Sequence, residues 1–305
     1  MTESKPCSTV FDVDEYDLEA TLDSGQAFRW ERLGEGWEGI VGGRWVRLEA
    51  RRDGRIGAST VVDAGDWGWL RNYLALDVDP RVIASTFPPD PPLLEAVRAC
   101  RGLRVLRQEP WECLASFILS STKQIVQIRQ IVGEICRRFG PRVKVPIGHP
   151  EAWGFPGARV IAGLEESGLR ACRMGFRAKY LLGSARAVVA GPLDLEGLRN
   201  LPLGEAREAL MELPGVGPKI ADCALLFSCG FDQAFPVDVW ILRTLRELYF
   251  PRRDPGRDRL LDFAGKHFGP YGGHAQQYLF HHARLRAGRV ASVRGDGAGS
   301  VRDGD

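Results

Sequence analysis

The spacing of hydrophobic residues changes along this 305-residue chain, and that change restricts the fold more than any other feature. Between residues 37 and 50, two extended runs flank Gly42-Gly43, and apolar positions alternate with polar ones, which is typical of a β-hairpin. Asp53-Gly54 predicts a second tight turn, so we expect an antiparallel meander with one face on a core and one in water. From about residue 93, apolar residues recur every three or four positions, which indicates amphipathic helices.

The predicted fold class is therefore α+β, with the two kinds of structure separated along the chain. We expect an antiparallel β domain at residues 1–92, a helical region at 93–290 and an unstructured tail at 291–305. No apolar run has the length of a membrane-spanning helix, and residues 1–7 do not resemble a secretion signal. The seven cysteines lack paired short spacings, so we expect a reducing compartment and no disulfide framework.

The charge of the chain is unevenly distributed about a proline-rich stretch at residues 87–92. Residues 1–95 hold 18 acidic and 10 basic side chains, whereas residues 96–305 hold 21 acidic and 31 basic ones. A basic surplus in the carboxyl-terminal part favours a polyanionic partner such as nucleic acid, although a solvated basic face explains it equally well.

Residues 203–230 have the pattern helix, tight turn, helix. Pro214 ends the first helix, Gly215 and Gly217 allow positive φ angles, and Pro218 suits the first turn of the second helix. The N–H groups at the start of that helix lack intrahelical partners and lie at the positive end of its dipole, which suits a phosphate. An ordinary helical hairpin with a glycine turn remains the alternative.

Lys219 and Asp238 are the candidate chemical pair. Lysine is scarce in this chain, and the helix dipole disfavours an ammonium at the start of a helix. A lysine in that position, desolvated in a cleft, is expected to lose its proton readily and to act as a nucleophile. Asp238 precedes a periodic apolar stretch, a position typical of a helix N-cap, and capping alone is the alternative role. A short return loop after the second helix brings it back toward Lys219.

The segments that carry these residues resemble those of a known family. The match lies in 213–223 (LPGVGPKIADC) and 236–238 (PVD), with further matches at 24–30 (SGQAFRW), 175–180 (GFRAKY) and 273–280 (GHAQQYLF). In this order they resemble the 8-oxoguanine DNA glycosylases of the helix-hairpin-helix/Gly-Pro-Asp superfamily, from about residue 10 to about residue 287.

The resemblance implies a bifunctional glycosylase and lyase that extrudes 8-oxoguanine from duplex DNA. Lys219 would attack deoxyribose C1′, expel the base and form a Schiff base that permits β-elimination. Asp238 would stabilise positive charge on the sugar and orient the lysine. The hairpin residues Gly215, Val216 and Gly217 would hold the DNA backbone.

The resemblance also assigns the recognition of the base. The carbonyl of Gly25 would accept the N7–H that distinguishes 8-oxoguanine from guanine, Cys223 and Phe280 would sandwich the base, and Gln276 would bind its Watson–Crick edge. From the residues alone, the structural roles are favoured instead: Gly25 as a turn glycine, Phe280 as a core aromatic and Cys223 as a small buried hydrophobe.

Five further positions would contact the DNA, and three of them depart from the family pattern. Phe176 would wedge into the duplex beside the lesion, and Arg177 would contact the unpaired base. Thr122 stands where eukaryotic members have an asparagine, and Gln127 stands where they have an arginine that reads cytosine. Trp240 replaces a histidine that contacts phosphate. Because Thr122 and Gln127 are weaker donors to cytosine, we predict relaxed discrimination of the opposite base.

No cofactor or metal is expected. Related enzymes with an iron–sulfur cluster carry its cysteines after the catalytic aspartate, and no cysteine follows Cys229 here. His274, His281 and His282 lack a cysteine nearby to complete a metal site. We expect a monomer that acts on duplex DNA, in a bacterial cytoplasm or, in a eukaryote, the nucleus. The alternatives are a glycosylase for another oxidised or alkylated purine and a non-catalytic DNA-binding module.

Overall fold

The computed structural model describes residues 7–61, 65–121, 124–191 and 193–296, and the side chains of these ranges up to residue 288. Its first part is a five-stranded antiparallel sheet with the strand order β1-β5-β4-β3-β2. The strands are β1 (Cys7–Phe11), β2 (Trp30–Leu33), β3 (Gly36–Val41), β4 (Arg44–Ala50) and β5 (Ile56–Thr60). Gly42 and Gly43 have φ angles of 54° and 73°, as a two-residue hairpin turn requires. The predicted meander is confirmed.

The sheet packs one face against α1 (Leu18–Leu22) and α2 (Gly68–Tyr73), where Val46 and Leu48 are buried. The opposite face was expected to lie in water, which is wrong at Trp45. This side chain is 5% exposed, because His149 lies edge-on to it at 5.6 Å between ring centroids. His149 is held there by Glu38, 2.7 Å away, and follows β6 (Arg142–Val143), which pairs with β7 (Ala152–Trp153). A distant segment thus covers this strand position.

Helices make up most of the remainder. Those before the hairpin are α3 (Pro80–Ser85), α4 (Pro91–Ala99), α5 (Pro110–Leu119), α6 (Ile125–Phe139), α7 (Ala158–Ala162), α8 (Glu166–Leu169) and α9 (Arg177–Ala190), with a π-helical turn, η1 (Arg170–Met174), and a 3-10 turn, η2 (Gly197–Asn200). The others are α10 (Leu203–Met211), α11 (Pro218–Ser228), α12 (Val239–Tyr249), α13 (Arg257–His267), the 3-10 turn η3 (Gly269–Tyr271) and α14 (Gly272–Asp296).

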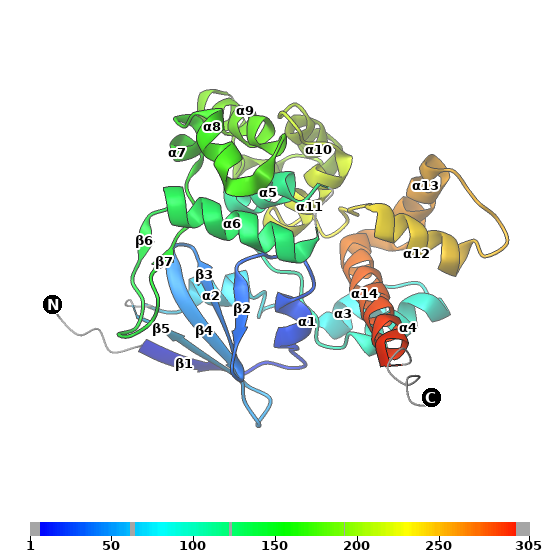
Figure 1. Ribbon diagram of the computed structural model, residues 1–305. Helices are drawn as coiled ribbons and strands as arrows, with labels where there is room; N and C mark the ends of the chain where they lie inside the picture. The colour runs from blue at the N-terminus through cyan, green and yellow to red at the C-terminus, as the bar shows by residue number, and fades with distance from the viewer. Residues whose placement is uncertain (1–6, 62–64, 122–123, 192, 297–305) are drawn as a thin grey trace, which may run out of the picture.

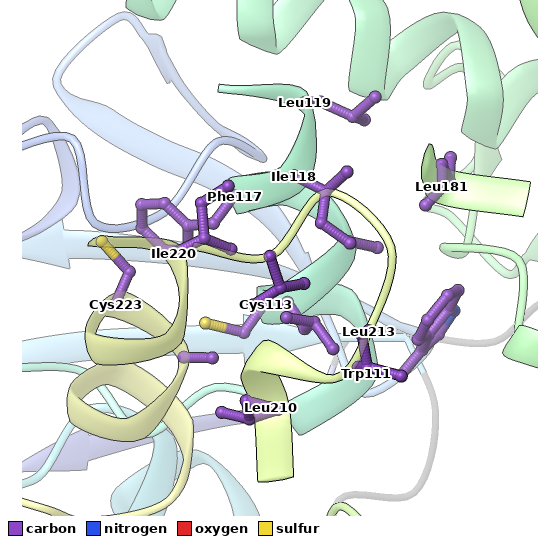
Figure 2. Close-up of a cluster of buried hydrophobic side chains, with 14 of the residues drawn as sticks. Trp111, Cys113, Phe117, Ile118, Leu119, Leu181, Leu210, Leu213, Ile220 and Cys223 are labelled. Carbon is purple, nitrogen blue, oxygen red and sulfur yellow. The ribbon is translucent and has the colours of Figure 1, made fainter. Parts of the chain in front are cut away.

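The helices form two groups, each with its own core (Figure 1). In the first, α5 packs against α11, and Figure 2 shows Ile220 and Cys223 of α11 beside Phe117 of α5. In the second, α14 packs against α4 and α12, so α3 and α4 share a core with the carboxyl-terminal helices. The division of the chain into domains at residue 92 stays a prediction.

Helix α14 is longer than expected. We predicted an unstructured tail from residue 291, but the helical backbone continues to Asp296, while residues 297–305 lie outside the described part. Residues 289–294 include no glycine or proline, so nothing in them stops a helix that is already nucleated in the core.

None of the helices in the described residues is long and apolar enough to span a membrane.

Candidate active site

The hairpin between α10 and α11 is a tight turn that depends on one glycine. Gly215 has a φ of 78°, and a Cβ there would lie 2.6 Å from the Tyr180 side chain, so only glycine fits. Ser184 of α9 donates a hydrogen bond to the Pro214 carbonyl at 2.8 Å and fixes the turn. Gly217 has an extended backbone with a φ of −101°, so it does not use the positive φ that glycine permits. A Cβ at Gly217 would meet nothing within 4 Å, which leaves that surface open.

The hairpin presents unpaired backbone donors. The N–H groups of Gly215 and Gly217 donate to no residue of the described chain. Val216 differs, because its side chain is buried and its N–H donates to the Leu213 carbonyl at 3.1 Å. The two glycine N–H groups, at the positive end of α11, are therefore the anion-binding part of this turn.

An ion pair within the hairpin ties its two helices together. Arg207 Nε on α10 lies 2.7 Å from Asp222 Oδ1 on α11. Burial raises the pKa of Asp222 to about 6, while Arg207 opposes this rise. The pair therefore links α10 to α11, the helix that carries Lys219.

A cavity of about 420 Å³ opens beside the hairpin and brings the predicted chemical pair together. Lys219 and Asp238 both line it, although they come from α11 and from the start of α12. The other lining residues are Gly25, Phe28, Phe117, Ser120, Gln124, Ile125, Val126, Ile128, Trp240, Phe280 and Arg284. Predicted catalytic and base-recognition residues from four distant parts of the sequence thus share one cavity.

Lys219 is held by α5. Its Nζ donates to Ser120 Oγ at 3.1 Å and lies 5.0 Å from the centroid of the Phe117 ring. Asp238 caps α12, as predicted, because its Oδ1 accepts the Ile241 N–H at 2.8 Å. The same carboxylate lines the cavity, so capping fixes its position without withdrawing it from the site.

Gly25 faces the cavity with an unusual backbone. Its φ is +83°, and a Cβ there would lie 2.8 Å from Ile125 Cδ1 and 3.5 Å from Phe280 Cε1. A side chain at this position would therefore fill the cavity as well as strain the loop. The Gly25 carbonyl accepts no hydrogen bond from any described residue, which leaves an acceptor for a ligand.

The two other predicted recognition residues, Gln276 and Cys223, are buried and are not among the residues that line this cavity. Gln276 is 5% exposed, yet its Oε1 has no hydrogen-bond partner within the described chain, an expensive arrangement for a buried polar atom. Cys223 is buried, and burial raises the pKa of its thiol to about 12, against the opposing effect of the nearby Lys219. Cys223 is therefore a neutral, polarizable side chain at pH 7.

The predicted wedge and its neighbour differ in placement. Phe176, at the start of α9, is 50% exposed, as a wedge residue must be. Arg177 is only 3% exposed, and its guanidinium donates to the carbonyls of Met174 and Ser121. In the structure without DNA, Arg177 thus binds inward carbonyls, and its contact with the unpaired base stays a prediction.

The three departures from the family pattern are placed as follows. Thr122 lies outside the described residues. Gln127 is exposed on the first turn of α6, where its Oε1 accepts the Gln124 N–H at 3.2 Å and so caps the helix. Trp240 is 43% exposed and lines the mouth of the cavity.

Sequence reasoning missed several residues of the cavity wall, among them Phe117, Ser120 and Arg284. Phe117 and Ser120 lie 99 or more positions from Lys219, so no local pattern links them to it. Arg284 follows Phe280 by one helical turn, and that spacing was the available signal. Among the described residues, no group of three or more metal-ligating side chains occurs.

Comparison with known proteins gives the same assignment over nearly the whole chain. Residues 8–114 match the model of the 8-oxoguanine DNA glycosylase N-terminal domain, and residues 115–266 match that of the HhH-GPD superfamily base excision DNA repair proteins. The chain is 30% identical to a probable N-glycosylase/DNA lyase of Methanothermobacter thermautotrophicus, over 92% of this chain and 97% of that protein. It is 33% identical to N-glycosylase/DNA lyase OGG1 of Arabidopsis thaliana, over 87% of this chain and 77% of that protein.

A solved structure agrees. The 8-oxoguanine glycosylase/lyase of Clostridium acetobutylicum, in complex with double-stranded DNA containing cytosine opposite 8-oxoguanine, superposes with a TM-score of 0.84 at 32% identity. The match covers 89% of this chain and 93% of that one. With the two domain matches in order along it, the chain belongs to the 8-oxoguanine DNA glycosylase family of the HhH-GPD superfamily.

Proposed function

We propose that this protein is a bifunctional DNA glycosylase and lyase that removes 8-oxoguanine from duplex DNA and then cleaves the abasic strand. The observation that carries the proposal is the shared cavity, which is lined by Lys219 and Asp238 and also by Gly25 and Phe280. A volume of about 420 Å³ accommodates a purine extruded from the helix.

The chemistry begins at the Lys219 amine. In its neutral form the amine attacks C1′ of the extruded nucleotide, and the C1′–N9 bond breaks with its electron pair leaving on the base. The Asp238 carboxylate stabilises the positive charge that develops on the sugar. Opening of the sugar ring gives the Schiff base, after which loss of a C2′ proton expels the 3′ phosphate.

The proposed recognition of the base uses acceptors left unpaired by the fold. The Gly25 carbonyl accepts the N7–H of 8-oxoguanine, a position at which guanine has a lone pair instead. Gln276 binds the Watson–Crick edge of the base, which supplies the partner that its buried Oε1 lacks. Phe280 and the neutral Cys223 pack against the two faces of the ring.

The proposed contacts with the DNA backbone do not depend on the base sequence of the DNA. The N–H groups of Gly215 and Gly217 bind phosphate oxygens, and Val216 supports the turn from inside. Phe176 fills the gap left by the extruded nucleotide, and Trp240 packs at the mouth of the cavity. We assign Arg177 to positioning the segment before α9, because its donors lie on inward carbonyls. The enzyme acts as a monomer, in a bacterial cytoplasm or in the nucleus of a eukaryote, where its DNA substrate lies.

Borohydride trapping tests this function. The protein is incubated with an 8-oxoguanine duplex and reduced, and we expect a covalent protein–DNA complex, because reduction converts the Schiff base to a stable amine. Matched duplexes carrying guanine or an alkylated purine serve as controls. A complex formed with the alkylated duplex alone would show that the protein repairs another lesion. No complex with any duplex would remove the lyase activity from the proposal, because a Schiff base is what the reduction traps.

Discrimination of the base opposite the lesion is predicted to be weak. Gln127 caps α6 with its own Oε1 and has no guanidinium with which to read cytosine. Excision of 8-oxoguanine opposite each of the four bases should therefore differ by no more than about tenfold, less than a bidentate arginine contact provides. Single-turnover rates on four matched duplexes measure this. A preference for cytosine of a hundredfold or more would contradict it.

A further inference from the structure

The loop from α1 to β2 leaves one carbonyl unpaired while side chains from outside the loop bind the carbonyls around it. The paired carbonyls are those of Asp23, bound by Arg284 Nη1 at 2.9 Å, Ser24, bound by Gln277 Nε2 at 3.4 Å, and Gln26, bound by Gln108 Nε2 at 2.7 Å. Within the described chain, the Gly25 carbonyl between them has no donor, and Gly25 lies on the cavity wall.

Asp23 joins this loop to two helices through two arginines. Arg284 of α14 binds its backbone carbonyl, and Arg129 Nη2 of α6 lies 2.6 Å from its Oδ1. In Figure 1, α1, which ends just before Asp23, lies between α14 and one end of α6. The side chains of Asp23 and Arg129 are 42% and 26% exposed, and neither lines the cavity with Lys219.

Glycine at position 25 makes contacts from outside the loop necessary. We call the contacts of Arg129 and Arg284 with Asp23 the clamp. Because Gly25 has no Cβ, its flanking peptides rotate at little steric cost, and nothing within the residue itself fixes the direction of its carbonyl. A hydrogen bond to the base depends steeply on the donor–acceptor angle. The direction of that carbonyl must therefore be set by contacts on the neighbouring residues.

We propose that Arg129 and Arg284, joined through Asp23, are positioning residues that hold the Gly25 carbonyl at the angle required to accept the N7–H of 8-oxoguanine. This inference rests on the proposed function. Excision of the base needs the carbonyl, whereas cleavage of a preformed abasic site does not, since no base is present. Both reactions use Lys219, but only excision needs the Gly25 carbonyl. Comparing the two rates therefore separates the effect of the clamp from the chemistry of the lysine.

The test compares Arg129→Met with Arg129→Lys and with Arg137→Met. Arg137 is the matched control, because it lies on the same helix and pairs with an acidic residue, Glu134, away from the loop. We expect Arg129→Met to lower the single-turnover rate of 8-oxoguanine excision about fivefold, as loss of one partly exposed ion pair predicts. Cleavage of an abasic duplex should stay within twofold. Arg129→Lys should restore excision, and Arg137→Met should change neither rate.

A second variant, Arg284→Met, removes the bond to the Asp23 carbonyl. Because Arg284 also lines the cavity, both reactions should fall, but excision should fall further, so that the ratio of excision to abasic-site cleavage drops about tenfold. Thermal unfolding midpoints of all variants show whether each one folds. The proposal would be wrong if excision and abasic-site cleavage fell equally, or if the ratio of their rates were unchanged in both Met variants. Failure of the unmutated protein to form a Schiff base even with abasic DNA would instead overturn the proposed function.

Discussion

Replacing Lys219 by glutamine is expected to abolish the borohydride-trapped complex and to lower excision of 8-oxoguanine by roughly 10⁴-fold or more, as is typical when an enzyme loses its nucleophile. The amide of glutamine has no nucleophilic lone pair, but it can still hydrogen-bond to Ser120. The hairpin N–H groups of Gly215 and Gly217 are unchanged, so affinity for DNA should stay within a fewfold. Trapping and DNA-binding assays on the same duplex measure both effects.

Lys266→Gln is the matched control for that experiment. It removes one positive charge from an exposed site on α13, where Lys266 pairs with Asp262 at 2.6 Å. We expect full trapping with this variant. A trapped complex that survived in Lys219→Gln would show that another amine forms the Schiff base, and the assignment of Lys219 would then be wrong.

The second large effect is expected for Asp238→Asn, which removes the charge of the carboxylate but retains its cap. Asparagine caps helices as well as aspartate does, so the bond to the Ile241 N–H should persist and stability should change by less than about 1 kcal/mol. Excision should fall by about 10²–10³-fold, because the developing charge on the sugar loses its stabilising partner. Single-turnover kinetics and thermal unfolding separate the two roles of this residue.

Two comparisons make the Asp238 result specific. Asp79→Asn changes another N-cap, at the start of α3, whose side chain accepts the Arg81 N–H, and we expect near-normal excision. Asp238→Ala should lose both activity and helix stability, the latter by about 1 kcal/mol. Normal excision by a folded Asp238→Asn would show that the carboxylate acts only as a cap.

The local structures that the sequence predicts are those specified by neighbouring residues. Gly42-Gly43 set the turn between β3 and β4, and Asp238 caps α12, because a turn or a cap depends on a few adjacent backbone angles. The α+β class follows from hydrophobic periodicity for the same reason, since the period reports which face of each element is buried. The family resemblance supplied the roles of Lys219, Asp238 and the base-recognition residues, which the residues alone left open.

Tertiary structure decided what depends on distant partners. The carbonyls that bury Arg177 and the ring of His149 that covers Trp45 lie on other elements, so neither outcome could be predicted from local pattern. The clamp on Asp23 joins residues more than 100 positions apart. Hydrophobic period and turn residues specify single elements, whereas the direction in which a polar side chain points is set by the nearest unpaired donor or acceptor, and only the packed fold determines which group that is.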